Sequence, residues 1–361
     1  MTTSPRAIRL VAGHEFRMRL RTGRWKWLLG GWTLVMLLFT WFLSVSLHAT
    51  RNINYYYDGS TMVHDNSSIG PQMFGILMLF VLGLMLIISP TLTSQSINGD
   101  RERGTLATLQ VTLLSPTDIA IGKLLAGWSV GLLALALSVP FVVWSLIEGG
   151  VGVLNAVVTL SVVAVLIGVI CAVAQALSAL VTRSISSGLL SYLVTAALTI
   201  GTLIAYFLAL SMTTEDKDVN FGGDSYGMER ISHPEDVWWL LSPNPFVVLA
   251  DSAPALPPLR ADDGRVISRS DDPLGGIRRS VRDMTRPDQL GPCASPGSDI
   301  GGNIGTRGTS YPPCRDGDAE PPPVWPWGLG FDVLLGLGAV TVTVRRLRTP
   351  AARLGRGVRV A

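Results

Sequence analysis

Charged residues are scarce in this sequence. Of its 361 residues, 15% are charged and 48% are hydrophobic, and the mean hydropathy is +0.40. Soluble domains average about 25% charged residues, and one soluble core could not bury so much apolar surface. Cysteine is also rare, with three in the whole chain. The composition therefore argues against a disordered chain, a disulfide scaffold and an ordinary soluble enzyme.

Motifs for catalysis are missing as well. The nearest approach to a phosphate-binding loop, Thr117 to Leu124, lacks the first glycine and the final hydroxyl that such loops need. His14-Glu15 has no second histidine at zinc-ligand spacing, and there is no G-x-S-x-G nucleophile motif. A membrane-embedded enzyme would need paired polar groups at one depth, and none are found. We expect no catalytic residue, bound cofactor, metal or nucleic-acid partner.

The apolar residues are gathered in six long runs. A helix needs about 20 mostly apolar residues to cross a membrane. The predicted fold is an all-α polytopic membrane protein, with a basic interfacial helix within residues 1–26. Its transmembrane helices are predicted at about 27–47, 72–97, 124–147, 151–181, 188–212 and 326–344.

The basic residues predict the orientation, because cytoplasmic loops carry the excess of Lys and Arg. With both termini inside, the inner segments hold the seven basic residues of 1–26, then Arg101, Arg103, Lys123 and Arg183, and the six arginines of the tail 345–361. Arginine outnumbers lysine by 26 to 3, a ratio typical of a high-GC bacterial genome. We expect a multi-pass protein of the bacterial plasma membrane that contacts anionic lipid through its basic first helix.

A 113-residue connection, residues 213–325, precedes the last span on the predicted outer side. Within it, 236–250 holds two short apolar stretches around Ser242-Pro243-Asn244-Pro245. This segment is predicted to form a re-entrant or interfacial pair of short helices, with a small extracytoplasmic core as the alternative. Residues 251–323 are either a solvated, partly disordered loop or, through their aspartate doublets, a substrate or ion contact. Cys293 and Cys314 lie here and form a disulfide or remain free thiols.

The connection after the second span carries the most informative pattern. Leu106, Leu109 and Leu113 recur on one face at helical spacing. We predict a short amphipathic helix at about 100–115 on the inner surface, with Thr105 near its start. Ser115-Pro116 would end it, and Thr117 or Asp118 would cap the next helix. A simple interfacial tether is the alternative.

This segment resembles the one after the second span in type-2 ABC exporter permeases. The resemblance rests on Glu102-Arg103-Gly104-Thr105-Leu106, then Leu113-Leu114-Ser115-Pro116, then Ile119 and Gly122-Lys123. It extends to the basic N-terminal helix, the six spans, Asn244-Pro245-Phe246 before the last span, and the basic tail. Two departures are Ala107, where the family has a second Glu, and the order of Ser and Pro.

The resemblance implies a permease subunit that pairs with a second copy or a paralogue and binds a separate ATP-binding-cassette ATPase. ATP and magnesium would then belong to that partner. The coupling helix would be residues 100–115, with an ATPase-coupling set of Glu102, Arg103, Gly104, Thr105, Leu106, Leu109 and Leu113. The N-terminal interfacial helix would lie beside the ATPase.

A few polar residues lie within the spans. Ser191, Thr195 and Thr199 recur every four residues on the fifth span and either line a pathway or bond to their own helix. Asp332, the one acidic residue well inside an apolar run, is a functional candidate or lies at the interface. Two other functions remain open, namely a secondary transporter or channel, and a membrane scaffold or assembly factor that transports nothing.

Overall fold

The computed structural model describes residues 4–21, 23–51, 56–58, 61–63, 69–104, 115–220, 226–254, 259–260, 266–268, 272–285 and 322–348. The helices, in chain order, are α1 (Pro5–Arg21), α2 (Gly23–Arg51), α3 (Gly70–Thr93), α4 (Asn98–Glu102), α6 (Pro116–Ile147), α7 (Val153–Leu180), α8 (Ser184–Ala196), the π-helix η1 (Ala197–Gly201), α9 (Thr202–Met212), the 3₁₀ turns η2 (Pro234–Asp236) and η3 (Trp238–Leu240), α10 (Pro245–Ser252), α11 (Pro273–Asp283) and α12 (Trp325–Leu347).

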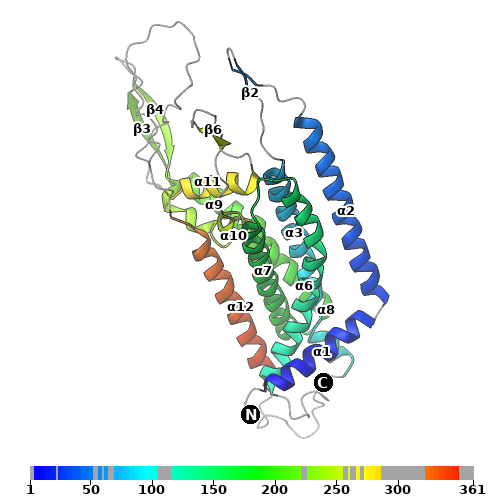
Figure 1. The fold of residues 1–361 in the computed structure, drawn as a ribbon. Helices are drawn as coiled ribbons and strands as arrows, with labels where there is room; N and C mark the ends of the chain where they lie inside the picture. Colours follow the sequence, from blue (N-terminus) through cyan, green and yellow to red (C-terminus); the bar gives the residue numbers. More distant parts are fainter. Residues whose placement is uncertain are drawn as a thin grey trace.

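Six helices are long and apolar enough to cross a membrane, which confirms the predicted helical, multi-pass architecture. They cover Lys26–Ala49, Gly70–Glu102, Pro116–Ile147, Val153–Leu180, Ser184–Met212 and Trp325–Leu347. Figure 1 shows them as an elongated bundle, with α1 lying across one end and α11 across the other. The start of α1 and the end of α12 lie at the same end of this bundle.

The third span begins eight residues earlier than the sequence predicted, at Pro116 rather than about 124. The prediction excluded charged residues from spans, but Asp118 and Lys123 are both buried inside this helix. Each has polar partners at the end of the bundle, so the helix continues through them. Partner groups, which a hydropathy pattern does not contain, explain the difference.

The centre of the bundle is the packing of α3, α6 and α7. The Gly127-x-x-x-Gly131 pair of α6 allows this close approach, as small residues do between membrane helices. A Cβ placed on Gly127 would lie 2.2 Å from Cγ2 of Thr93 on α3, and one on Gly131 would lie 2.8 Å from Cγ2 of Ile167 on α7. The two glycines therefore fit α6 against two different neighbours.

The first span is attached at the side of this core. The indole nitrogen of Trp32 on α2 donates a hydrogen bond of 3.1 Å to the hydroxyl of Ser138 on α6. Farther along, the ring of Phe39 stacks on that of Phe80 of α3, with ring centroids 3.7 Å apart. Much of the rest of α2 is exposed, including Trp41 and Phe42, as expected of a helix that faces lipid.

The described parts of the connection before the last span are more ordered than a solvated loop. Its segment 236–250 forms η3 and α10, and Val237, Leu241 and Val247 join a small apolar core with Tyr206 of the fifth span. Short helices therefore occupy this segment and contribute to a core, and a re-entrant or interfacial location stays a prediction. Within 251–323, the prediction of a solvated loop is wrong for 273–283, which forms the packed helix α11.

Asp272, the second residue of the doublet Asp271-Asp272, has a structural role at the start of α11. Asp272 is the N-cap of α11, and its carboxylate accepts a hydrogen bond of 2.7 Å from the backbone N–H of Gly275. This is the ordinary use of Asp before a helix. The geometry therefore accounts for Asp272 as a helix cap.

The predicted disulfide pair, Cys293 and Cys314, lies outside the described residues.

Short antiparallel hairpins are added to the helical body. Their strands are β1 (Tyr56–Asp58) with β2 (Thr61–Val63), β3 (Thr214–Asn220) with β4 (Tyr226–Ser232), and β5 (Leu259–Arg260) with β6 (Val266–Ser268). All belong to connections between spans, at the end of the bundle where α11 lies (Figure 1). The spanning part of the fold remains helical.

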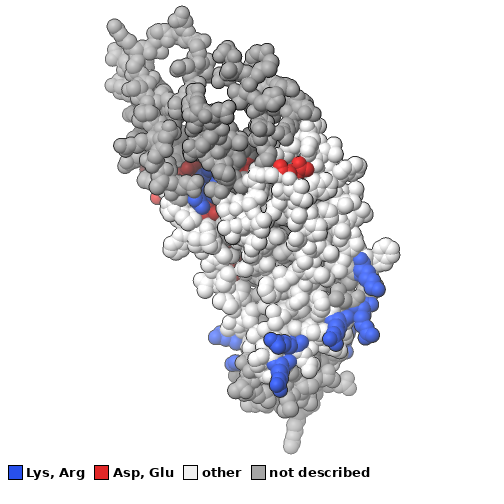
Figure 2. Space-filling model, viewed as in Figure 1, with Lys and Arg blue, Asp and Glu red and all other residues white. Residues whose placement is uncertain are grey.

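Charge is distributed unevenly along the bundle. Figure 2 shows an uncharged band between the basic residues at the α1 end and the charged residues among the described atoms at the other end. The exposed basic residues described at the α1 end are Arg6, Arg9, Arg17, Arg21, Lys26, Arg103, Arg183, Arg345, Arg346 and Arg348. Exposed tryptophans mark both ends of the band, with Trp27 near α1 and with Trp239 and Trp327 opposite. Tryptophan favours the membrane interface, so the band has the pattern of a hydrocarbon-spanning surface.

Candidate functional site

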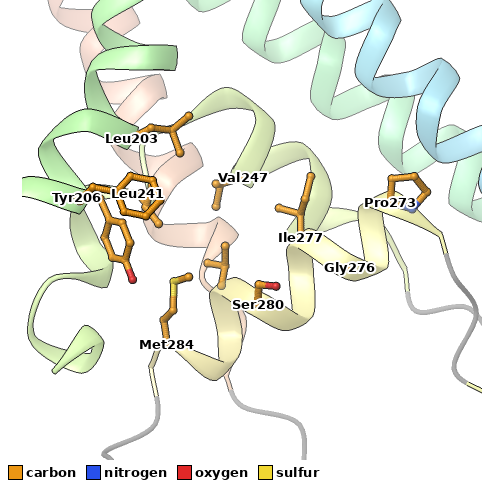
Figure 3. Close-up of a pocket in the computed structure, with 11 residues that line it drawn as sticks. Leu203, Tyr206, Leu241, Val247, Pro273, Gly276, Ile277, Ser280 and Met284 are labelled. Carbon is orange, nitrogen blue, oxygen red and sulfur yellow. The ribbon is translucent and has the colours of Figure 1, made fainter. Parts of the chain in front are cut away.

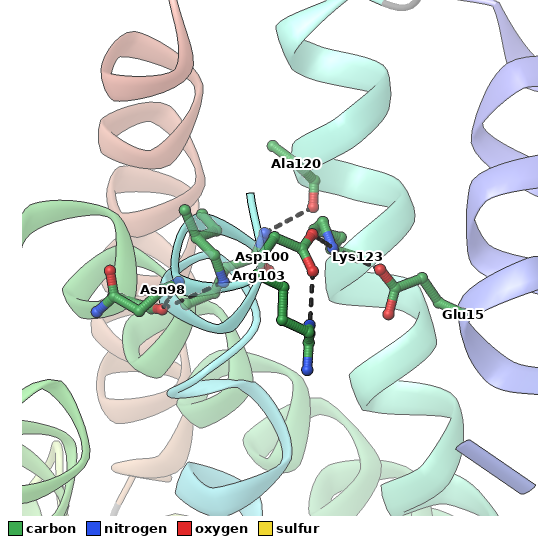
Figure 4. A network of polar contacts seen from close by, with 9 residues as sticks. Glu15, Asn98, Asp100, Arg103, Ala120 and Lys123 are labelled. Carbon is green, nitrogen blue, oxygen red and sulfur yellow. Dashed lines mark hydrogen bonds and ion pairs between the residues drawn. The ribbon is translucent and has the colours of Figure 1, made fainter. Parts of the chain in front are cut away.

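A buried ionic cluster lies where α1 crosses the bundle. Lys123 of α6 is 1% exposed, and its Nζ lies 2.5 Å from Oε1 of Glu15 on α1 and 2.5 Å from Oδ2 of Asp100 on α4. We call Lys123, Glu15 and Asp100 the Lys123 triad (Figure 4). Arg103 completes the charge balance, with Nη2 3.1 Å from Oδ1 of Asp100. One buried ammonium group thus joins α4 and α6 to α1, which lies about a hundred residues earlier in the chain.

The local sequence explains why α1 lies across α6. A Cβ on Gly122 would approach the side chain of Val11 to 2.8 Å, so the glycine lets α1 pack directly on α6. Beside it, the carboxylate of Asp118 accepts a hydrogen bond of 3.1 Å from the backbone N–H of Ser4. Ser115, rather than Thr117 or Asp118, is the N-cap of α6. Ser115 and Asp118 form a reciprocal capping box, which corrects the predicted cap.

The chain that follows α3, at the end of the second span, is also bonded to the fourth and fifth spans. We call residues 94–104 the junction segment. Toward α7, the backbone N–H groups of Ile97 and Asn98 donate to Oγ of Ser178, and Nδ2 of Asn98 donates to the carbonyl of Val181. From α8, Oγ of Ser187 donates to the carbonyl of Ser94, and Oγ of Ser184 donates to Oε1 of Glu102. With the Lys123 triad, the junction segment is therefore tied to α1, α6, α7 and α8.

The predicted ATPase-coupling residues fall partly on this segment. Glu102 ends α4 and accepts the 2.6 Å hydrogen bond from Ser184 at the start of α8. Gly104 has φ of +68°, and no atom lies within 4 Å of a Cβ placed on it. Glycine is therefore required there by backbone conformation, as is common just after a helix.

The described structure differs from one continuous helix over 100–115. α4 ends at Glu102 and a turn follows at 103–104, because the left-handed conformation of Gly104 cannot continue an α-helix. Thr105, Leu106, Leu109 and Leu113 lie outside the described residues. The amphipathic helix predicted from the three leucines thus remains a prediction.

The hydroxyl row of the fifth span bonds to its own helix. Ser191, Thr195 and Thr199 each donate to the carbonyl four residues earlier, at 2.7, 3.0 and 3.0 Å. Of the two interpretations left open by the sequence, this geometry supports backbone bonding. The carbonyl of Thr199, inside η1, also accepts a 2.7 Å hydrogen bond from Nδ2 of Asn244, the N-cap of α10. The Asn-Pro motif thus anchors α10 to the fifth span.

Asp332 lies inside the bundle rather than at its surface. It is 1% exposed, and neither carboxylate oxygen has a hydrogen-bond partner among the described residues. Gly328 and Gly336, one turn to either side, hold α12 close to α10 and α7. Their added Cβ atoms would approach Val248 to 2.8 Å and Val169 to 3.4 Å. The side chain of Asp332 is therefore enclosed by neighbouring helices, and its depth in the membrane stays a prediction.

Replacing Asp332 by Asn is expected to stabilise the protein at alkaline pH. An ionised carboxylate buried without a partner costs at least about 1–3 kcal/mol, whereas Asn has nearly the same shape and no charge. Thermal unfolding in detergent measures the difference, with Thr341→Val on the exposed face of α12 as the control. A lower unfolding temperature for Asp332→Asn would contradict the assignment of Asp332 as an unpaired acid.

Sequence reasoning missed most of this site. Lys123 entered the prediction as an inner-loop charge. In the sequence, Glu15 falls on the helical face of Ile8, Val11 and Met18 and interrupts an otherwise apolar row. That interruption was the available signal, because a carboxylate on a buried face needs a buried cation. The described residues contain no group of three or more His, Cys, Asp or Glu side chains that could hold a metal ion.

No protein-family model matches the chain, and no curated protein matches it.

Proposed function

We propose that this chain is the permease subunit of an ATP-binding-cassette exporter, with both termini in the bacterial cytoplasm. A separate ATPase subunit would bind ATP and magnesium and dock at the α1 end. A second copy or a paralogue would complete the pathway. The chain itself carries no ATP chemistry in this proposal.

The observation that carries the proposal is the connectivity of the junction segment. It holds Glu102-Arg103-Gly104, the part of the family-like motif that is described, at the basic end of the bundle. Through hydrogen bonds and the Lys123 triad it contacts α1 and three spans. A partner that displaced this segment would therefore move several spans together, as a coupling element must.

The basic end supports the same orientation. The exposed lysines and arginines around α1 and the end of α12 satisfy the rule that cytoplasmic loops carry positive charge. The location of the junction segment at this end would place it within reach of a soluble cytoplasmic subunit.

The decisive experiment combines binding and coupling. A neighbouring reading frame that encodes a G-x-x-x-x-G-K-[ST] protein supplies the candidate ATPase, which is co-purified with this chain and reconstituted in vesicles. In the double variant Glu102→Ala, Gly104→Leu, we expect ATP-dependent transport to fall by about 5–150-fold. This is the change that a typical coupling free energy produces.

Glu148→Ala, at the opposite end of the bundle, is the matched control and should leave coupling unchanged. Thermal unfolding of each variant separates lost coupling from lost folding. Normal assembly and ATP-dependent transport by the double variant would overturn the coupling assignment.

Asp332 favours a second candidate, a secondary transporter driven by an ion gradient. Intramembrane acids often mark proton or ion relays, and this one is buried without a described partner. Transport that follows an imposed proton gradient, needs no ATPase and is abolished by Asp332→Asn would support this candidate. ATP-dependent transport that survives Asp332→Asn would exclude it.

A further inference from the structure

A cavity of about 460 Å³ lies between α9, α10 and α11, at the end of the bundle opposite α1 (Figure 3). Its lining is mainly apolar and includes Leu203, Tyr206, Phe207, Val247, Ile277 and Met284. The volume falls in the range of roughly 300–1,000 Å³ that is usual for small-molecule sites. None of the groups assigned to the Lys123 triad or to the junction segment lines it.

The cavity borders an exposed apolar surface of the fifth span. Leu203 and Phe207 line it and are also 42% and 64% exposed. They belong to the fifth span, the least buried of the six candidate spans. The neighbouring residues Ile204 and Leu208 are exposed as well. In a membrane, lipid chains would therefore lie directly at the mouth.

Two hydroxyl groups interrupt the apolar lining. Tyr206 is 3% exposed, and Ser280 comes from the facing side of α11. Within the described part of the chain, neither hydroxyl group has a recorded hydrogen bond. A small number of polar groups in an apolar cavity is the usual arrangement for orienting a ligand.

The shape of the cavity narrows the choice of occupant. A helix is at least about 10 Å wide, so a cylinder of that width and this volume would be only about 6 Å long, about one turn. A helix of a second copy therefore does not fit, and an apolar cavity is a poor site for water. One flexible hydrocarbon chain fits both the lining and the opening.

We propose that this cavity binds one acyl chain of a membrane phospholipid, with Tyr206 and Ser280 donating hydrogen bonds to an ester or headgroup oxygen. The chain enters past Leu203 and Phe207 and lies between the fifth span and α11. This site is formed by the fifth span together with α10 and α11, and it is independent of the proposed coupling to an ATPase.

The test uses the whole chain reconstituted in phosphatidylcholine–phosphatidylglycerol vesicles. The vesicles contain a phospholipid with a photoreactive diazirine on its acyl chain, and adducts are mapped by mass spectrometry. We expect labelling of Tyr206, Ile277 and Met284. Gly276 lines the cavity, and no atom lies within 4 Å of a Cβ placed on it. Gly276→Trp should therefore fill the cavity and reduce this labelling at least about tenfold, equivalent to about 1.4 kcal/mol.

Gly330→Trp on α12 is the matched control, because a Cβ there also meets nothing within 4 Å and the residue does not line the cavity. It should leave the labelling unchanged. A second variant, Ser280→Ala with Tyr206→Phe, should weaken labelling without adding bulk. Three results would overturn the proposal. These are adducts confined to the exposed Ile204 and Leu208, cavity adducts insensitive to Gly276→Trp, and the absence of lipid adducts at Tyr206, Ile277 and Met284.

Discussion

Replacing Lys123 by Ala should lower the free energy of unfolding by about 3–5 kcal/mol. The substitution leaves the carboxylates of Glu15 and Asp100 facing each other across a site from which water is largely excluded, since their side chains are 19% and 10% exposed. Loss of the cation also releases α1 from α6, so the effect should extend to the junction segment. Thermal unfolding in detergent measures the stability, and limited proteolysis measures the release of α1.

The charge balance provides the control for this prediction. A triple variant, Lys123→Met with Glu15→Gln and Asp100→Asn, removes the cation together with both buried charges. It should recover most of the lost stability, because the main cost is the unpaired charge. Arg183→Ala, at an exposed position of the same end, should change stability by less than about 0.5 kcal/mol. If Lys123→Ala is no worse than Arg183→Ala, the triad does not hold this end together.

Replacing Asp251 by Ala should have a comparable effect at the opposite end, about 3–5 kcal/mol. Its buried carboxylate lies 2.5 Å from Nε of Arg282 on α11. It also accepts hydrogen bonds of 2.6 and 2.7 Å from the backbone N–H groups of Val324 and Trp325, at the start of α12. One side chain from the end of α10 therefore joins α11 and α12. Its loss removes the carboxylate that pairs with one guanidinium group and accepts hydrogen bonds from two backbone N–H groups.

Hydrogen exchange of residues 273–283, together with thermal unfolding, measures this effect. We expect faster exchange in α11, because Asp251 is one of the few polar anchors that attach this helix to the bundle. Asp283→Ala, an exposed acid on the same helix, is the matched control. Unchanged protection of α11 in Asp251→Ala would show that apolar packing of Leu274 and Val281 is sufficient to hold it. The phospholipid labelling proposed above should also fall in Asp251→Ala, since α11 forms one wall of the cavity.

Hydropathy predicted the six spans well because each one depends on local composition. A run of about 20 apolar residues forms a helix in hydrocarbon, since every backbone polar group must be bonded within the segment. The prediction differed at charged residues whose partners lie far away in sequence. The sequence predicts a start of the third span at about 124, after the charged residues Asp118 and Lys123. In the structure both are buried, because Ser4 bonds to Asp118 while Glu15 and Asp100 pair with Lys123.

The candidate site was predictable only in part, because its contacts also join residues that lie far apart in the sequence. The segment around Glu102 and Gly104 attracted attention through its pattern, but the positive φ of Gly104 and the bond from Ser184 to Glu102 came from the structure. Similarly, Asp332 was recognisable as an unusual acid in an apolar run. The burial of its side chain depends on Gly328 and Gly336, which bring α12 against α10 and α7.

The sequence by itself determined the number of apolar helices, the concentration of basic residues in a few segments, and the absence of known catalytic motifs. These properties are sums over neighbouring residues, so no tertiary contact is needed to read them. Only the tertiary structure decided that Lys123 is buried between two carboxylates, that α11 is a packed helix, and that an apolar cavity opens beside the fifth span. Each of these depends on groups separated by tens to hundreds of residues, whose contact is set by helix packing rather than by local composition.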